Sequence, residues 1–180
     1  IIKKYNLNIV DIKKFKLEKY KTNIILFDAG EKTSKNKRIL KALNYIDFPY
    51  FFVTYGDGVA NYNIKKSIKE FEISQKPTLV CSKKINSNYG HLRIKNNLVN
   101  KFLEKPILQD PINIGFYIFK KTLFEKLGKK FKSLENDLLP YLSKKNLLKN
   151  YDHKGYFFNF DSKNDFKNMQ RTSKSFLRYL

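Results

Sequence analysis

The most constraining stretch of this sequence is residues 51–59, an apolar run that ends at a carboxylate between two glycines. Residues 51–55 are rich in aromatic and β-branched side chains, and Gly56-Asp57-Gly58 follows directly. A buried strand that stops here presents Asp57 at the carboxyl edge of an α/β sheet, where such folds bind ligands. Gly56 and Gly58 would let the backbone turn sharply and approach a ligand closely.

The alternative interpretation of this stretch is a hairpin turn. An Asp-Gly pair between two apolar runs is a strong hairpin signal. Residues 63–74, however, have helical spacing, with Asn63 as a helix N-cap and Ile64, Ile68 and Phe71 as the buried stripe. The helical spacing therefore favours a strand–turn–helix unit.

The chain alternates strands and helices at first and then changes to hairpins. This order predicts one domain over residues 1–180, with a mixed three-layer α/β sheet. The expected elements are strands at 23–28, 50–55, 77–83, 112–119, 147–152 and 156–160, a hairpin at 91–104 that turns at 96–97, and helices at 35–46 (capped by Ser34), 63–74 and after Ser133.

The formal net charge is +21, from 37 basic and 16 acidic residues. A charge of this size suggests nucleic-acid binding. Only four basic residues are Arg, however, and the Lys residues are scattered through every expected element. Proteins that read bases and phosphates usually use clustered Arg side chains. We therefore do not expect nucleic acid as the main partner, although a nucleic-acid-binding domain remains an alternative, and the positive surface should attract phosphorylated small molecules.

Cys81 is the only cysteine of the chain. A disulfide framework or a thiolate metal site within one chain is therefore impossible, and a reducing compartment is favoured. No apolar run approaches the length of a membrane span. We expect a cytoplasmic protein with no membrane segment.

Two carboxylates follow predicted strands in comparable settings. Asp57 ends the strand at 50–55, and Asp161 follows the strand at 156–160. Strand-end carboxylates that converge at one sheet edge could hold Mg²⁺, which takes oxygen ligands and keeps waters beside substrate phosphates. The alternative role for Asp161 is the N-cap of a C-terminal helix, and the two roles can coexist.

Three further positions could contact a ligand, Lys105 as a positioned cation for a phosphate. Lys105 lies between an acidic residue and a proline, which should restrict it to extended conformations and define the direction of its side chain. Asn113, near a glycine inside a strand (Gly115), could offer an amide to a sugar hydroxyl. Gly90 could present its backbone to a ligand. The alternatives are a surface lysine, a solvent-facing strand position and an ordinary turn.

Neither histidine is assigned to catalysis. His153 lies in Asp-His-Lys-Gly, which we expect to form a surface turn, and His91 lacks a nearby partner pattern. The sequence contains no Gly-x-Ser-x-Gly, His-Glu-x-x-His or Cys-x-x-Cys motif.

Several short motifs follow one another in order: Asp28-Ala29-Gly30 with Arg38 ten residues on, Tyr55-Gly56-Asp57-Gly58-Val59, Tyr89-Gly90, Glu104-Lys105-Pro106, Ile112-Asn113-Ile114-Gly115-Phe116, and His153-x-Gly155-Tyr156-Phe157 followed by Asp161-Ser162-Lys163-Asn164-Asp165. From about residue 22 to 170 the chain thereby resembles the sugar-1-phosphate nucleotidyltransferases. The form Tyr-Gly-Asp-Gly-Val resembles the glucose-1-phosphate cytidylyltransferase branch most closely.

The resemblance implies a nucleotide-diphospho-sugar transferase (Rossmann-like) fold. It also implies Mg²⁺-dependent nucleotidyl transfer from a nucleoside triphosphate, CTP, to a sugar 1-phosphate, glucose 1-phosphate, and possible homo-oligomers. On that pattern Asp57 and Asp161 ligate Mg²⁺, and Lys105 neutralises the sugar phosphate. The substrate-binding residues that it implies are Gly56, Gly58, Arg38, Gly90, Glu104, Asn113 and Gly115.

The chain also departs from the family pattern. The opening strand and the Gly-rich phosphate loop of the family are not found in these residues, and we expect them to lie before Ile1. We therefore expect the 180-residue chain to have little turnover. The Gly-Gly before the family's Arg is Asn36-Lys37 here, Ile114 replaces a glycine, and Phe157 replaces a Trp.

The segment Ser133-Leu-Glu-Asn-Asp-Leu-Leu-Pro resembles a different branch, the guanylyltransferases that act on mannose- or heptose-type phosphates. A guanylyl- or uridylyltransferase is therefore the nearest alternative enzyme. A non-catalytic relative that retains sugar-phosphate binding is a further alternative.

Overall fold

The computed structural model describes residues 13–17 and 22–160 of the chain. Within them lie ten strands and six helical segments. They are β1 (Lys13–Leu17), β2 (Thr22–Leu26), α1 (Lys35–Ala42), η3 (Leu43–Tyr45), β3 (Tyr50–Thr54), β4 (Gly58–Ala60), α2 (Ile64–Ser74), β5 (Thr78–Lys83), β6 (His91–Lys95), β7 (Leu98–Leu103), β8 (Ile112–Lys120), α3 (Lys121–Leu127), η4 (Leu134–Leu138), α4 (Leu139–Lys144), β9 (Leu148–Asp152) and β10 (Phe157–Asn159).

The centre of the fold is a four-stranded sheet with the order β3-β8-β5-β9. β8 lies antiparallel to both β3 and β5, whereas β5 and β9 are parallel. A parallel pair needs a crossover connection, and the stretch that includes α3 and α4 lies between β8 and β9 in the chain. The mixed sheet confirms the expected α/β class.

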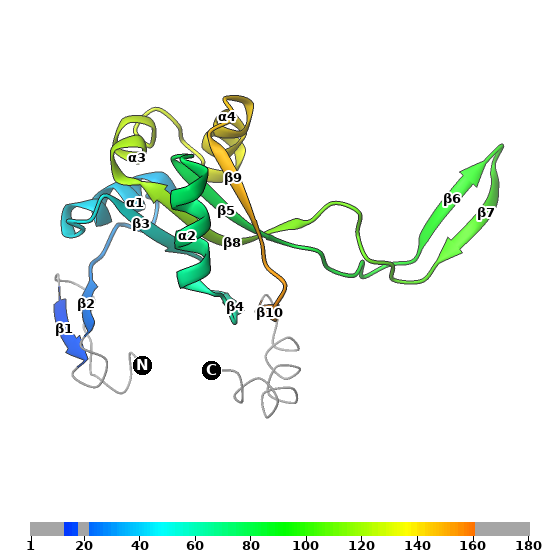
Figure 1. The fold of residues 1–180 in the computed structure, drawn as a ribbon, viewed down its shortest axis with the longest axis horizontal. Helices are drawn as coiled ribbons and strands as arrows, with labels where there is room; N and C mark the ends of the chain where they lie inside the picture. Colours follow the sequence, from blue (N-terminus) through cyan, green and yellow to red (C-terminus); the bar gives the residue numbers. More distant parts are fainter. Residues whose placement is uncertain (1–12, 18–21, 161–180) are drawn as a thin grey trace.

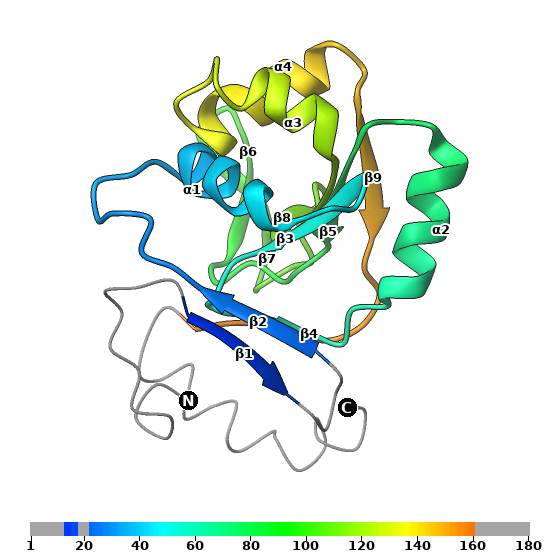
Figure 2. The same ribbon diagram turned by 90° about the vertical axis from the view of Figure 1, so that its left-hand side faces the viewer.

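Helices cover both faces of this sheet (Figures 1 and 2). In one apolar cluster, side chains of α1, α3 and α4 pack against Phe51, Tyr117 and Phe119 of the sheet. The other cluster joins Phe71 of α2 to Ile118 and to residues of β5 and β9. Neighbouring residues of β8 therefore pack on opposite faces, as a buried strand requires. This arrangement confirms three layers.

Side-chain caps explain where the predicted helices begin. Ser34 accepts a hydrogen bond from the Lys37 N–H at 3.5 Å, and Asn63 accepts one from the Lys66 N–H at 2.8 Å. Ser133 accepts from the Asn136 N–H at 3.0 Å and begins the π-helical turn η4, which continues as α4. Each cap satisfies an N–H group that the first helical turn leaves unpaired.

The stretch around Asp57 is not a hairpin. β3 pairs with β8, while β4 pairs with β10, so the strands on either side of Gly56-Asp57 have different partners. The helix expected after Asn63 is α2. The strand–turn–helix interpretation is therefore confirmed, with the short strand β4 between the turn and the helix.

The predicted hairpin β6–β7 extends from the sheet as an arm (Figure 1). Its apolar side chains are largely in contact with solvent; Ile94 and Phe102, for example, are both 62% exposed. At the base of the arm the two connecting segments are joined by backbone hydrogen bonds, from the Ser87 N–H to the Pro106 carbonyl at 2.8 Å and from the Leu108 N–H to the Ile85 carbonyl at 2.9 Å.

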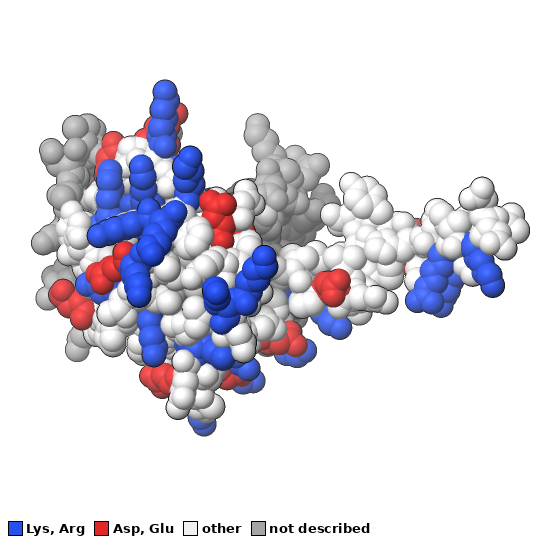
Figure 3. Space-filling view, turned by 90° about the horizontal axis from the view of Figure 1, so that it is seen from above, with Lys and Arg blue, Asp and Glu red and all other residues white. Residues whose placement is uncertain are grey.

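Lys and Arg side chains are spread over the body and along the arm, with Asp and Glu between them (Figure 3). In the part of the chain that the structure describes, no helix is both long and apolar enough to cross a membrane.

Candidate functional site

Asp57 lies in the turn between β3 and β4, as the sequence predicted for a strand-end carboxylate. Asp57 is exposed, and its backbone carbonyl accepts a hydrogen bond from the Phe160 N–H at 2.9 Å. Together with the β4–β10 pairing, this bond holds the end of the described chain beside Asp57. Asp161 itself lies outside the described residues, as does the helix that it was expected to cap.

Asp57 lines a cavity of about 500 Å³ between the end of β3 and helix α1. The charged side chains of the lining are Asp57, Lys35 and Arg38. The other lining residues are Ile39, Val53, Thr54, Tyr55, Gly56 and Leu134. The cavity therefore combines an apolar wall with two cations and one carboxylate, a composition suited to a phosphorylated ligand that has an apolar part.

The guanidinium of Arg38 also orders the loop before α1. Its Nε donates to the Thr33 carbonyl at 2.8 Å, and its Nη2 donates to the Glu31 carbonyl at 2.8 Å. Lys41 Nζ donates to the carbonyl of Ala29, in the same loop, at 2.9 Å. Arg38 was expected to bind substrate, and the structure places it at the cavity with much of its donor capacity given to this loop.

Two residues that line the cavity, Lys35 and Tyr55, belong to a series of hydrogen-bonded polar side chains. Lys35 Nζ lies 2.5 Å from Glu135 Oε1 and 4.5 Å from the centre of the Tyr55 ring. Glu135 accepts a hydrogen bond from the Tyr55 hydroxyl, which lies 3.1 Å from the Tyr117 hydroxyl. Asn113 Nδ2 donates to the Tyr117 hydroxyl at 2.6 Å.

The ionisation of these groups is strongly shaped by their surroundings. Burial, followed by the hydrogen bond to Glu135, raises the pKa of Tyr55 far above its ordinary value. Burial also raises the pKa of Tyr117. For Glu135, burial opposes ionisation, but the hydrogen bonds from Lys35 and Tyr55 outweigh it and lower the pKa of the carboxyl group. At neutral pH this series of hydrogen-bonded side chains therefore contains one ionised carboxylate, Glu135, and two neutral phenols, Tyr55 and Tyr117.

Asn113 and Gly115 meet at one end of this polar chain. Asn113 Oδ1 accepts from the Gly115 N–H at 3.0 Å, so both ends of the amide have partners within the protein. Gly115 has φ +77°, and a Cβ built on it would come 2.7 Å from Tyr55 Cδ2. The close approach that the sequence indicated at Gly115 is thus made by an aromatic ring.

Gly56 and Gly58 are in a different situation. A Cβ on Gly56 would meet no atom within 4 Å, and one on Gly58 would make only ordinary contact, 3.4 Å from Phe157 Cε2. Neither glycine has a positive φ. Packing within the described residues therefore does not require glycine at these two positions.

The sugar-binding residues expected around Lys105 lie at the base of the arm. Gly90 and Glu104 come together there, since a Cβ on Gly90 would lie 3.2 Å from Glu104 Oε2. Neither lines the cavity beside Asp57, and neither does Lys105. A second cavity, of about 580 Å³, adjoins this region and is lined by residues that include His91, Arg93 and Pro106.

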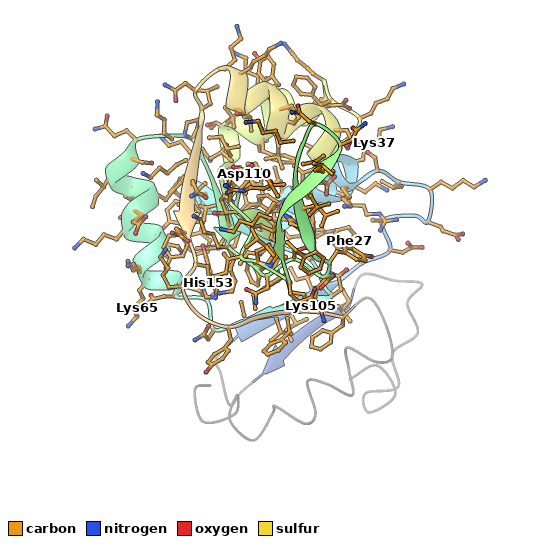
Figure 4. All side chains as sticks on the ribbon, turned by 90° about the vertical axis from the view of Figure 1, so that its right-hand side faces the viewer. Phe27, Lys37, Lys65, Lys105, Asp110 and His153 are labelled. Atoms are coloured by element: carbon orange, nitrogen blue, oxygen red, sulfur yellow. The ribbon has the colours of Figure 1, made fainter. Side chains whose placement is uncertain are left out.

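The prediction that Pro106 holds Lys105 in an extended conformation is wrong. Lys105 has φ +43°, in the left-handed region. The chain must turn at the end of β7 so that the Pro106 carbonyl can accept from Ser87, and this pairing outweighs the local preference. Figure 4 labels Lys105 in a view along the arm.

The prediction of a surface turn at His153 is also wrong. His153 is only 4% exposed, and its Nε2 lies 2.9 Å from the Tyr156 carbonyl. Because a carbonyl only accepts, Nε2 must carry the proton. The backbone N–H of His153, which Figure 4 labels, also donates to the Ser82 carbonyl at 2.8 Å and so continues the β5–β9 pairing into the loop. His91 has a partner too, since its Nε2 lies 2.9 Å from Ser87 Oγ.

Sequence reasoning did not identify Lys35, Glu135 or Tyr117 as parts of a site. Glu135 stands in the Ser133 segment, which was interpreted as a helix cap and as a branch marker. Tyr117 carries no signal beyond a buried aromatic residue of a strand. The sequence separations of 62 from Tyr55 to Tyr117 and 80 from Tyr55 to Glu135 explain why no local pattern joins them.

The donor set around Asp57 is compatible with Mg²⁺. Across residues 22–160, no group of three or more His, Cys, Asp or Glu side chains could hold a metal ion. Mg²⁺ is commonly bound by one or two carboxylates together with substrate phosphates and water. An exposed carboxylate beside a basic cavity meets that description.

The fold and this cavity together define an α/β protein with a cavity at the carboxyl end of the edge strand β3, the kind of position where such folds bind ligands. A model of the nucleotidyl transferase family matches residues 1–163. The chain belongs to the nucleotidyl transferase family.

Two curated relatives show the range of this similarity. A probable glucose-1-phosphate cytidylyltransferase of Bacillus subtilis is 30% identical over 152 residues, which cover 84% of this chain and 59% of that protein. A mannose-1-phosphate guanyltransferase of Candida albicans is 27% identical over 123 residues, which cover 64% of this chain and 34% of that protein. The chain thus spans less than two thirds of the length of these relatives.

A solved structure supports the same fold. The crystal structure of HddC from Yersinia pseudotuberculosis matches with a TM-score of 0.60 and 24% identity, over 82% of this chain and 65% of that one. The expected nucleotide-diphospho-sugar transferase fold is confirmed.

Proposed function

We propose that this protein transfers a nucleotidyl group from a nucleoside triphosphate, CTP, to a sugar 1-phosphate, glucose 1-phosphate. A phosphate oxygen of the sugar 1-phosphate attacks the α-phosphorus, the bond from that phosphorus to the β-phosphate oxygen breaks, and pyrophosphate leaves with the electron pair. The products are a nucleoside diphosphate sugar and pyrophosphate. The observation that carries the proposal is a strand-end carboxylate, Asp57, at a basic cavity in a chain of this family.

Asp57, with Asp161 as its partner, is proposed to hold Mg²⁺, which when bound neutralises phosphate charge. The support is the exposed position of Asp57 and the hydrogen bond that brings Phe160 to its carbonyl. Lys35 and Arg38, at the same cavity, raise the local concentration of anionic ligands. Such chemistry depends mainly on positioning and on neutralising charge.

Gly56 and Gly58 are proposed to leave room for the ligand. An added Cβ at Gly56 would touch no described atom, so the protein itself sets no steric demand for glycine there. A ligand that approaches the backbone closely would set that demand. For the sugar phosphate we propose Lys105 as the neutralising cation, with Glu104, the Gly90 backbone, Asn113 and Gly115 as orienting groups.

The nearest alternative is guanylyl transfer to a mannose-type 1-phosphate, and similarity to a mannose-1-phosphate guanyltransferase supports it. A non-catalytic sugar-phosphate-binding protein and a basic nucleic-acid-binding domain are alternatives of other classes. The net charge of +21 is the only support for the last. We also propose a cytoplasmic location and homo-oligomeric assembly; light scattering after gel filtration would test the assembly.

Pyrophosphate release is the decisive assay, run with Mg²⁺, glucose 1-phosphate or mannose 1-phosphate, and each of the four nucleoside triphosphates. We expect CTP with glucose 1-phosphate to give the highest rate, and GTP with mannose 1-phosphate would indicate the alternative branch. Calorimetric titration of each nucleotide and each sugar phosphate, measured in parallel, reports binding independently of turnover.

Asp57→Asn tests the metal proposal, with Asp47→Asn as its control, since Asp47 is also exposed but lines neither cavity. We expect Asp57→Asn to weaken Mg²⁺-dependent nucleotide binding by at least about tenfold, or 1.4 kcal/mol, and Asp47→Asn to leave it unchanged. If the wild-type chain neither binds nucleotide nor releases pyrophosphate, the proposal fails. DNA retention that is sensitive to salt and survives competition by nucleotide would then favour the nucleic-acid alternative.

A further inference from the structure

We propose that Glu135 fixes the direction of a hydrogen-bonded chain through Tyr55 and Tyr117, and that this chain fixes which way the amide of Asn113 points. Glu135, Tyr55 and Tyr117 are then positioning residues for Asn113. The part of the inference that concerns a ligand, a sugar hydroxyl at Asn113, rests on the proposed function. The direction of the hydrogen-bonded chain does not rest on the proposed function.

The contacts form one unbroken path from the cavity to β8. Lys35 Nζ lies 2.5 Å from Glu135 Oε1, and the same oxygen accepts from the Tyr55 hydroxyl. The Tyr55 and Tyr117 hydroxyls are 3.1 Å apart, and Tyr117 is fully buried. Asn113 Nδ2 lies 2.6 Å from the Tyr117 hydroxyl, and Asn113 Oδ1 lies 3.0 Å from the Gly115 nitrogen.

Each tyrosine hydroxyl has only one proton to donate, and this decides which group is the donor in every hydrogen bond along the path. An ionised carboxylate can only accept, so Tyr55 must use its single hydroxyl proton toward Glu135. The Tyr55 oxygen can then only accept from Tyr117, whose own proton is thereby used. The Tyr117 oxygen must therefore accept from Asn113, which turns Nδ2 toward Tyr117 and Oδ1 away from it.

Gly115 fixes the same orientation independently from the other end. Its backbone N–H is a donor and needs an acceptor, which the Asn113 Oδ1 atom supplies. A flipped amide would direct Nδ2 at this N–H and Oδ1 at a Tyr117 oxygen that has no proton left to donate. The flip would thus lose two hydrogen bonds, each of which contributes to keeping one orientation.

The groups that face Glu135 favour its ionised form. The titratable ones are Lys35 from α1, Tyr55 after β3 and Tyr117 from β8. Lys35 is a cation whose Nζ lies 2.5 Å from Glu135 Oε1, and this direct contact stabilises the carboxylate. The direction of the chain is therefore set under the conditions in which a sugar phosphate would bind.

A fixed amide has a consequence for recognition. With one N–H given to Tyr117 and one lone pair given to Gly115, Asn113 keeps one N–H and one lone pair in fixed places. The residue itself is exposed, and we expect these remaining groups to be open to a ligand. A ligand hydroxyl then meets a donor where a flipped amide would present an acceptor.

Side-chain amide NMR of the ¹⁵N-labelled protein tests the direction without any ligand. In the wild type we expect the Asn113 amide proton that bonds Tyr117 to lie downfield of its partner. Tyr117→Phe and Glu135→Gln should both shift the Asn113 amide and the Gly115 N–H resonances. Tyr141→Phe makes the same change in a ring that packs against Phe131 outside the path, and should leave both resonances unchanged.

Calorimetric titration with glucose 1-phosphate tests the consequence. We expect Tyr117→Phe and Glu135→Gln to raise the dissociation constant roughly 3- to 10-fold, the effect of about one hydrogen bond, with no change in Tyr141→Phe. The Glu135 side chain is 32% exposed whereas Tyr117 is fully buried, so Glu135→Gln serves as the folded variant if Tyr117→Phe does not fold.

The two measurements separate the two hypotheses. Unchanged Asn113 and Gly115 resonances in both path variants would overturn the positioning proposal, whatever the ligand does. Shifted resonances in a protein that binds no sugar phosphate would support the path and contradict the proposed function. Shifted resonances with unaltered affinity for glucose 1-phosphate would overturn the role of Asn113 as its ligand.

Discussion

The ring of Tyr55 lies directly against Gly115, so close that a Cβ on this glycine would come 2.7 Å from Tyr55 Cδ2. The contact joins the end of β3 to the middle of β8, where the Tyr55 N–H also donates to the Gly115 carbonyl at 3.3 Å. The absence of a side chain at Gly115 therefore determines where the Tyr55 hydroxyl, and with it the polar chain, can lie.

We expect Gly115→Ala to destabilise the protein by about 2–4 kcal/mol. An alanine at φ +77° is strained by roughly 1 kcal/mol, and its methyl group would displace a partly buried ring. Chemical unfolding measures the loss. Gly56→Ala is the matched control, because its φ is not positive and an added Cβ there has no neighbour within 4 Å. An equal effect of the two substitutions would contradict the role of the Tyr55 contact.

Much of the fold could be predicted from local signals. Alternating apolar residues, the caps at Ser34 and Asn63 and the Asn-Asn turn at 96–97 each act within a few residues, and the elements that they predict are present. Helix α3 was not anticipated. It follows β8 without a break, and its N-cap residue, Lys120, makes no side-chain capping bond, so neither a turn nor a cap marks where it begins.

The candidate site was predicted only where one residue carries the signal by itself. Asp57 is such a residue, because the strand before it and the glycines around it are adjacent in sequence. The conformation of Lys105 and the burial of His153 depend on pairing with Ser87 and Ser82 from other segments. The path from Glu135 to Asn113 joins η4, the end of β3 and β8, which are far apart in sequence, so its members are recognisable only in three dimensions.

His153 should contribute to stability far more than His91 does. We expect His153→Ala to lower the free energy of unfolding by about 1–3 kcal/mol, since it removes a buried ring and the hydrogen bond from Nε2 to the Tyr156 carbonyl. His91→Ala removes only an exposed ring and its contact with Ser87, and should change stability by less than about 1 kcal/mol. Denaturant titration of both variants compares the two. A larger loss from His91→Ala would show that His153 is not held as described.

Cys81 should be inert while the protein is folded. Burial, reinforced by Asp152 and opposed by Lys83, raises the pKa of the Cys81 thiol to about 12, and the side chain is fully buried. The thiolate is the reactive form, so we expect a disulfide reagent at pH 8 to modify Cys81 only as fast as the protein opens, and immediately in denaturant. As the only cysteine, it leaves no other thiol to confuse the result.

The same thiol links stability to alkaline pH. Because its pKa is higher in the folded than in the unfolded state, its contribution is fully present below about pH 9 and is lost as pH rises toward 12. Cys81→Ala should remove this part of the alkaline loss. Rapid modification of the native protein at pH 8 would contradict the burial of Cys81.

Glu135 should link stability to acidic pH in the opposite sense. Burial resists its ionisation, but the hydrogen bonds from Lys35 and Tyr55 prevail, so its pKa is lower in the folded state than its ordinary value of 4.5. Its contribution is therefore fully present above about pH 4.5 and is lost as pH falls through the folded value. At neutral pH we expect Glu135→Gln to lower the free energy of unfolding by about 1–2 kcal/mol, as for a hydrogen bond to a charged group.

The difference between wild type and Glu135→Gln should shrink steadily as the pH is lowered below 4.5, because the wild-type carboxyl group then becomes neutral as well. Glu125→Gln is the matched control. Glu125 is also paired with a lysine, but at 4.0 Å and with its side chain 47% exposed, so its loss should change stability by less than about 1 kcal/mol. Urea unfolding from pH 3 to 7 measures both variants. A gap between wild type and Glu135→Gln that stays constant over that range would show that the carboxylate charge of Glu135 does not stabilise the fold.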